Sequence, residues 1–177
     1  LVTQGDKQLV FAPYTTFTRD SVRVGILGLT EPEAMQSSGV ELNAAIVDPV
    51  AAARELVAEL RPQVDLLVAL SHLGLDVDQQ LAAEVPGIDL IVGGKTRQLL
   101  QEPVRVGDTI IVQQGYSGEW LGVTKASFSA QGAPTEATTL ALPLTEQFKD
   151  DAEMVKLLAP IREAYPTPTP EPTFTRD

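Results

Sequence analysis

Three nearly continuous apolar runs occur before residue 95, at 22–29, 64–74 and 88–94. Runs of this length without polar alternation predict strands that are buried on both faces. A strand-like stretch at 7–19 precedes the first run, and the two strands are expected to join near Arg19–Ser21. The pattern therefore begins with two joined strands and continues into a buried sheet.

Helical periodicity separates the buried runs. Residues 48–62 predict a helix in which Asp48 caps the first turn, Pro49 suits that turn, and Pro62 ends the helix. Residues 76–87 predict a second, shorter helix. Strand, helix, strand, helix, strand is the order that produces a parallel α/β layer.

The pattern changes in the second half of the chain. The segments 109–115, 120–129 and 136–144 alternate more and are separated by turn residues, which predicts an antiparallel meander. Residues 150–165 predict a capped helix that is interrupted or ends near Pro160. The parallel strands are thus expected to be followed by a smaller antiparallel part.

These patterns give three parts along the chain. We expect an α/β domain over 1–147, a C-terminal helix over 148–165 and a Pro/Thr-rich linker over 166–177. The chain starts at Leu1 within polar sequence, and we expect it to be part of a longer protein.

Composition and charge exclude several classes of function. The chain has 177 residues, 44% of them hydrophobic, a net charge of −11 and an isoelectric point of about 4.5. An acidic chain lacks the excess of Lys and Arg that nucleic-acid binding or docking on anionic membranes needs. No 18-residue stretch is free of charge, so no membrane insertion is expected. There are no cysteines, which excludes disulfides and thiolate metal sites within this chain.

Polar residues follow two of the predicted parallel strands. One group is Ser71-His72-Leu73-Gly74 and the other is Gly93-Gly94-Lys95-Thr96-Arg97. Ligands of open α/β sheets bind beyond the C-terminal ends of the strands, where both groups are expected to lie. His72 is the only histidine of the chain. Taken alone, a single histidine after a strand is more often a capping or hydrogen-bonded residue than a ligand.

The stretch DLLVALSHLGLDVDQQLAAEVPGIDLIVGG, at 65–94, resembles the calcineurin-like metallophosphoesterases of the 5′-nucleotidase branch. The resemblance continues upstream through VRVGILGLT and downstream through VRVGDTIIVQQGYSGEWLGVTKASF, and it covers about residues 5–145. It implies a four-layer α/β/β/α sandwich of which this chain supplies the second half.

The resemblance also implies a two-metal site, and this chain departs from it. Family members use two divalent ions, held largely by histidines and carboxylates, to activate water and neutralise phosphate. His72 matches one family ligand position, but the family's His-x-His motif is replaced by Lys95 and Arg97. Arginine has no lone pair to donate, and a lysine beside a dication must first lose its proton. We therefore expect a vestigial ligand at His72, no metal cofactor and no catalytic residue in this chain.

Three functions follow from this departure. The first is a degenerate, non-catalytic domain, a pseudoenzyme that serves as a scaffold or interaction module. The second is a metal-dependent phosphoesterase or nucleotidase whose N-terminal half lies outside this chain. The third is metal-free binding of an anion or nucleotide through Lys95, Arg97 and Gly94. In the first case, Lys95 and Arg97 are solvated residues that pair with a carboxylate such as Glu102.

Other polar and aromatic residues give weaker signals. Asp76 and Asp78 are expected to cap the second helix, and Trp120 is expected to pack in the sheet. Glu31 and Glu33 follow another strand and are candidates to face the cleft.

A half-sandwich leaves one face of its sheet uncovered. We expect this face to be covered by the missing N-terminal half or by another protein chain. The family and the Pro/Thr-rich tail lead us to expect export to the periplasm or the extracellular space.

Overall fold

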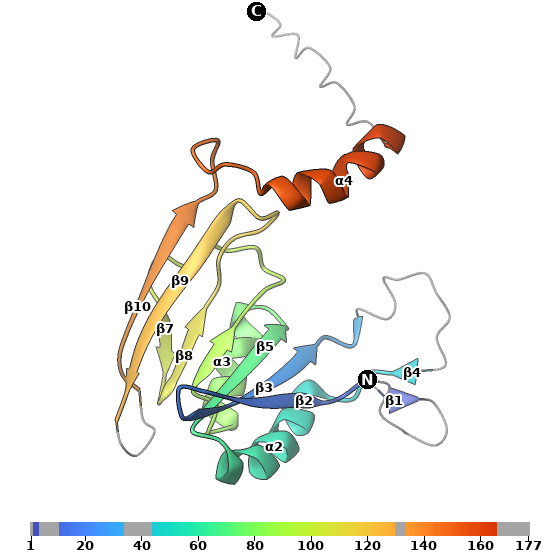
Figure 1. Ribbon diagram of the computed structural model, residues 1–177. Helices are drawn as coiled ribbons and strands as arrows, with labels where there is room; N and C mark the ends of the chain where they lie inside the picture. The colour runs from blue at the N-terminus through green and yellow to red at the C-terminus, as the bar shows by residue number, and fades with distance from the viewer. Residues whose placement is uncertain (1, 4–10, 34–43, 130–133, 166–177) are drawn as a thin grey trace, which may run out of the picture. The chain divides into compact units, whose positions relative to one another are not determined.

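The computed structural model describes residues 2–3, 11–33, 44–129 and 134–165 (Figure 1). The strands are β1 (Val2–Thr3), β2 (Tyr14–Arg19), β3 (Val22–Thr30), β4 (Ala44–Ala45), β5 (Leu66–His72), β6 (Leu90–Val92), β7 (Val104–Val106), β8 (Thr109–Val112), β9 (Trp120–Phe128) and β10 (Pro134–Pro143). The helices are α2 (Pro49–Leu60), the 3-10 turn η1 (Arg61–Gln63), α3 (Leu75–Glu84) and α4 (Ala152–Ala164). The chain divides into a compact unit that ends at Pro143 and a second unit that starts at Leu144.

A six-stranded sheet in the order β2-β3-β5-β6-β8-β7 is the centre of the first unit. The strands β3, β5, β6 and β8 run parallel, and the two edge strands pair antiparallel with their neighbours. The predicted α/β class with a parallel layer and an antiparallel part is confirmed. The antiparallel part is narrower than predicted, because β8 pairs in parallel with β6 instead of joining a meander with β9 and β10. Alternation of side chains along β8 does not reveal which strand it pairs with.

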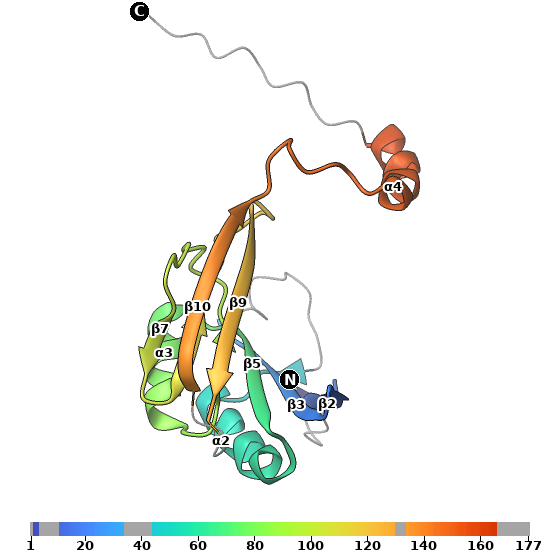
Figure 2. The same cartoon turned by 60° about the vertical axis from the view of Figure 1, so that its left-hand side comes forward.

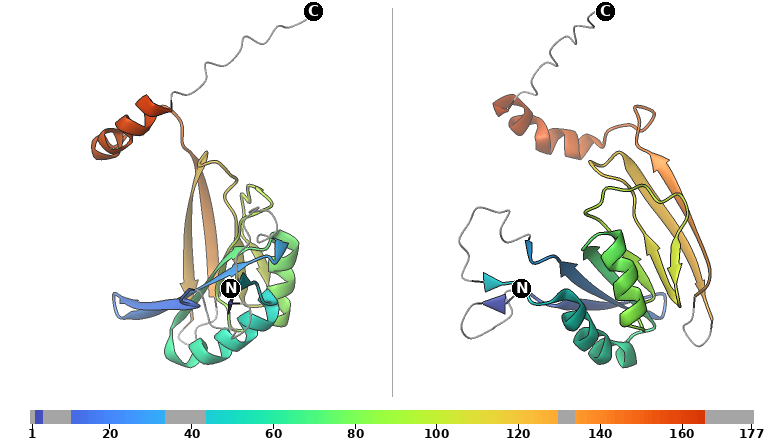
Figure 3. Two further views of the ribbon diagram at one scale, coloured as in Figure 1. Left: turned by 90° about the vertical axis from the view of Figure 1, so that its right-hand side faces the viewer. Right: turned by 180° about the vertical axis from the view of Figure 1, so that it is seen from behind.

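Helices α2 and α3 cover one face of this sheet, as Figure 3 shows. The strand residues on this face share one register row and are fully buried: Leu27, Ala69, Ile91 and Ile111. They pack in one cluster with Leu60 of α2 and Leu81 of α3. Burying each large aliphatic side chain contributes about 1.5–3 kcal/mol, so this layer is the main source of stability for the unit.

The ends of α2 are set by local sequence, as predicted. Asp48 accepts a hydrogen bond from the backbone nitrogen of Ala51 at 2.7 Å, and Pro49 occupies the first turn. The α-helix gives way to η1 just before Pro62. By contrast, α3 begins after Gly74, which offers no side-chain cap. The prediction that the aspartates at the start of α3 are caps is therefore wrong, and the role of one of them is described below.

The hairpin β9–β10 lies over the β8 side of the opposite face of the sheet (Figure 2). Its inner face carries small residues and approaches the sheet closely. An added Cβ at Gly122 would come within 2.2 Å of the Gln114 side chain, so only glycine fits there. Gln114 donates to Thr139 at 3.4 Å, and the hydroxyls of Thr139 and Thr124 lie 3.1 Å apart. These contacts join the hairpin to Gln114, which lies just after the end of β8.

Near the C-terminal ends of β5 and β6, the same face is apolar and exposed. Leu70 and Val92 are paired in register on β5 and β6, and they are 50% and 37% exposed. Gly28 continues the same row on β3. Exposed aliphatic residues at adjacent positions of a sheet form a patch that soluble proteins usually cover.

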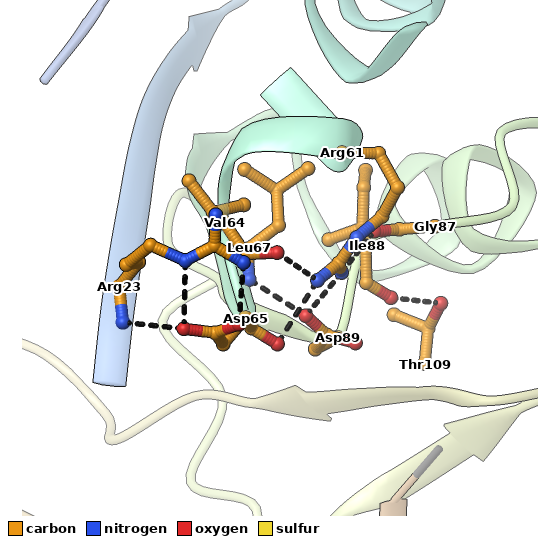
Figure 4. Close-up of polar contacts among 9 residues, drawn as sticks. All are labelled: Arg23, Arg61, Val64, Asp65, Leu67, Gly87, Ile88, Asp89 and Thr109. Atoms are coloured by element: carbon orange, nitrogen blue, oxygen red, sulfur yellow. Dashed lines mark hydrogen bonds and ion pairs between the residues drawn. The ribbon is translucent and has the colours of Figure 1, made fainter. Parts of the chain in front are cut away.

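At the N-terminal ends of the parallel strands, Arg61 joins several backbone segments (Figure 4). Its guanidinium donates to the Asp89 carboxylate at 2.6 Å. It also donates to three carbonyl oxygens, those of Gly87, Val64 and Asp65. Asp89 in turn accepts from the backbone nitrogen of Leu67 at 2.6 Å. The network fixes the starts of β5 and β6 without contributing to the opposite, C-terminal edge.

The second unit consists of α4 and the segment before it. Asp151 caps the helix by accepting from the backbone nitrogens of Glu153 and Met154 at 3.0 and 2.9 Å. The prediction that the helix is interrupted or ends near Pro160 is wrong, since it continues to Ala164. Proline removes only one backbone donor, so one further helical turn can follow it. In that turn the backbone nitrogen of Tyr165 donates a hydrogen bond to the carbonyl oxygen of Ile161 at 2.8 Å.

The predicted linker over 166–177 lies outside the described residues. Within the part of the chain that is described, no helix combines the length and apolar character that crossing a bilayer requires.

Candidate functional site

The parallel strands bring the two predicted polar groups to one edge of the sheet. Thr30 and His72 are register partners at the ends of β3 and β5, and β6 runs on into Gly93 and Gly94. A Cβ added to Gly94 would lie 3.4 Å from the His72 Nδ1 atom. His72 and the loop after β6 are therefore neighbours, and the His72 side chain is exposed.

The loop after β6 has an unusual backbone. Lys95 and Arg97 both have positive φ angles, 63° and 57°, which non-glycine residues rarely adopt. Thr96, between them, holds the loop in place. Its hydroxyl exchanges hydrogen bonds with the Gln113 side-chain amide at 3.0 and 3.1 Å, and its backbone nitrogen donates to the Gly94 carbonyl at 2.7 Å. Gln113 is buried, so it gives the strained loop a fixed anchor.

The two cations of this loop have different partners. Lys95 forms an ion pair with Glu31, which follows the last residue of β3. The Arg97 guanidinium lies over the Tyr116 ring, 5.6 Å from its centroid. The carboxylate that pairs with Lys95 is therefore Glu31 and not the expected Glu102. Glu31 is 64 residues away in the chain, so only the register of β3 against β5 and β6 brings the pair together.

A buried acid beneath the loop was missed by the sequence reasoning. Asp78 is completely buried, and its Oδ1 accepts a hydrogen bond from the Ser71 hydroxyl. Burial raises the pKa of the Asp78 carboxyl, although the bond from Ser71 opposes the shift. Its Oδ2 has no hydrogen-bond partner among the described residues. A signal was available, because Asp78 precedes the buried Leu81 by three positions and so shares its face of α3.

Asp78 also explains one of the two glycines. A Cβ at Gly93 would lie 2.7 Å from Asp78 Oδ2 and 3.3 Å from Gln113 Oε1. Gly93 therefore lies where the end of β6, the start of α3 and the Gln113 side chain meet. This position has no room for a side chain. The Ser71 hydroxyl also accepts from the backbone nitrogen of Leu73 at 3.2 Å, which orders the turn that carries His72.

The aromatic residues near this edge have separate roles. Trp120 packs against the backbone at Gly115, where an added Cβ would lie 3.0 Å from the indole. Tyr116 is exposed and contacts Arg97. Trp120 is thus a packing residue, as expected, and Tyr116 is the aromatic neighbour of the loop.

The donor set of this edge does not suit the two divalent ions that the resemblance implies. His72 offers an imidazole, but Lys95 and Arg97 offer only N–H donors in their protonated forms. The nearby Glu31 carboxylate is already paired with Lys95. Within the described residues, no three His, Cys, Asp or Glu side chains gather as a metal site would require. The residues present therefore do not make a two-metal centre by themselves.

Comparison with known proteins gives a consistent result. No protein-family model matches the chain. It is 30% identical over 159 residues to the trifunctional nucleotide phosphoesterase protein YfkN of Bacillus subtilis, covering 85% of this chain and 11% of that protein. It is 30% identical over 142 residues to the 5′-nucleotidase of Bos taurus, covering 70% of this chain and 25% of that protein.

Among solved structures, the 5′-nucleotidase precursor from Thermus thermophilus superposes with a TM-score of 0.77 at 30% identity. The match covers 87% of this chain and 34% of that structure. The chain thus spans between about a tenth and a third of the length of these proteins. The matching fold confirms the predicted half of the 5′-nucleotidase architecture.

Proposed function

Because the homologues of this chain are 5′-nucleotidases and metallophosphoesterases, whose domain it matches in a C-terminal part, we propose that it acts as a non-catalytic module of that fold. The observation that carries the proposal is the loop after β6. There, Lys95 pairs with Glu31, and Arg97 contacts Tyr116. The Arg97 charge repels a divalent ion, and neither side chain offers it a lone pair in its protonated form.

The module needs a covering partner. The patch of Leu70 and Val92 is apolar and exposed, and so is the outer face of the hairpin, formed by Leu121, Val123 and Leu140. These surfaces support packing against an N-terminal half or another protein chain. Leu70→Asp in the full-length protein should then lower its melting temperature strongly, because it would bury a charge. The same change at the exposed Phe11 should have little effect. Equal, small effects of both changes would contradict a covered face.

Two observations favour an enzyme as the alternative function. His72 keeps an exposed imidazole at the end of β5, and the chain spans only a fraction of its relatives. Residues outside this chain would then complete a phosphoesterase site. The decisive measurement is the metal content of the natively isolated, full-length protein by elemental mass spectrometry. About two divalent ions per chain, as two-metal hydrolases hold, would favour the enzyme. Essentially none would favour the non-catalytic module.

A further candidate function is metal-free binding of an anion or nucleotide. Its support is that Arg97 contacts the Tyr116 ring, and among the described residues no carboxylate forms an ion pair with it. Gly94 beside it lets a ligand approach the backbone. Replacing Lys95 and Arg97 by glutamate should abolish binding of inorganic phosphate to the full-length protein. Unchanged phosphate binding would overturn this candidate.

We place the protein in the periplasm or outside the cell. The Thermus thermophilus neighbour is described as a precursor, and a Pro/Thr-rich segment of the kind found between modules ends the sequence. Fractionation of the native host tests this placement, with a resident cytoplasmic enzyme as the control. Recovery of the protein in the cytoplasmic fraction would exclude it.

A further inference from the structure

The Glu31 carboxylate, which pairs with Lys95, is firmly placed. Its side chain is 18% exposed, whereas that of its partner Lys95 is 40% exposed. It follows the last residue of β3 and precedes Pro32, and a residue before proline favours extended backbone. The acceptor of the ion pair is therefore the more sheltered group and is attached directly to the sheet.

Lys95 is held independently of this pair. Its left-handed backbone is part of the loop that Thr96 anchors to the buried Gln113. Two groups that are already positioned by separate elements meet at a high effective concentration. An anion from solution must therefore compete with Glu31 for the Lys95 ammonium.

Arg97 differs from Lys95 in this respect. It lies over the Tyr116 ring, and among the described residues no carboxylate forms an ion pair with it. Glu31 thus neutralises the charge of Lys95, whereas the charge of Arg97 is available to an anion.

We propose that Glu31 is a built-in competitor for the anion site of this loop. Its carboxylate occupies Lys95 in the resting protein, and a phosphate-type oxyanion engages both Lys95 and Arg97 only by displacing it. This inference rests on the anion-binding function proposed above. In the resting protein, the ion pair between Glu31 and Lys95 weakens anion binding at this site. The strength of that pair therefore sets the affinity of the site for the anion.

The test is a titration of the full-length protein with inorganic phosphate, in which calorimetry measures the affinity for phosphate. Glu31→Gln frees Lys95 and removes a neighbouring negative charge. Because an exposed ion pair changes an equilibrium constant by up to about five-fold, we expect phosphate to bind more tightly by up to about five-fold. The matched control is Glu84→Gln, which removes the same charge from an ion pair with Arg54 on the helices. Its phosphate affinity should equal that of the wild type.

The outcomes separate this inference from the function on which it rests. Tighter binding in Glu31→Gln, with Glu84→Gln unchanged, supports the competitor. If Glu31→Gln binds phosphate no better while Lys95→Gln weakens binding, the site is real and the competitor is overturned. If neither the wild type nor Glu31→Gln binds phosphate, both fail. Glu31→Ala serves as a second variant, with the same expected direction, in case Glu31→Gln does not fold.

Discussion

The Ser71 hydroxyl donates a hydrogen bond to the Asp78 carboxyl and so joins the end of β5 to the first turn of α3. Both side chains are buried, and His72 follows Ser71 directly. The position of the turn that carries His72 therefore depends on the Asp78 carboxyl, which contacts no solvent. Burial disfavours its charged form, which gives this pair a predictable pH dependence.

We predict that Asp78 makes the protein less stable as the pH rises. Its pKa is raised in the folded state by burial, so the folded protein binds more protons than the unfolded chain above the ordinary pKa of 3.8. Stability is then lost between that value and the raised pKa. Asp78→Asn removes the titration and should flatten this part of the curve. Denaturant unfolding from about pH 4 to about pH 8 measures the difference, and parallel curves for both proteins would refute the prediction.

Asp65 should have the opposite pH dependence. Hydrogen bonds from the Arg23 side chain and backbone lower the pKa of Asp65 from 3.8 to about 2. The stabilisation is complete above the unfolded value and disappears as the pH falls through about 2. Asp65→Asn should therefore lose stability at neutral pH and show a weaker acid dependence than the wild type. Acid unfolding followed by circular dichroism tests this, and identical acid midpoints would count against it.

Arg61 should be more important for stability than any exposed ion pair. Its partner Asp89 has a side chain that is only 8% exposed. Arg61→Met keeps the aliphatic contacts but leaves this carboxylate without its cation, which should cost about 3 kcal/mol of unfolding free energy. Arg54→Met is the control, because it breaks the exposed pair with Glu84 and should cost less than about 1 kcal/mol.

The Arg61 prediction has an internal check. In the double variant Arg61→Met/Asp89→Asn the unpaired charge is absent, so part of the loss should be recovered. A double variant that is less stable than Arg61→Met would show that the buried charge is not the cause.

The sequence was informative where the determinants are local. The apolar runs of β3 and β5 and the Asp48–Pro49 cap of α2 define these elements without reference to the remainder of the chain. Determinants that join distant segments were not visible. The pairing of Lys95 with Glu31 depends on strand order, and the parallel pairing of β8 with β6 is not encoded in β8 alone. Asp78 was misjudged because a carboxylate near a helix start more commonly caps the helix than lies buried.

The close approach at Gly93 gives a final prediction, for a pair of matched alanine substitutions. Gly93→Ala would place a Cβ 2.7 Å from the buried Asp78 Oδ2, in a site with no room to relax, and should cost about 1–3 kcal/mol. On the same sheet, a Cβ added at Gly28 meets none of the described residues of this chain within 4 Å. Gly28→Ala should be neutral or stabilise the protein by about 0.5–1 kcal/mol, because alanine restricts the unfolded chain more than glycine does. Chemical denaturation of both variants tests this contrast. Equal stabilities would mean that the contact between Gly93 and Asp78 does not limit the packing beneath the loop.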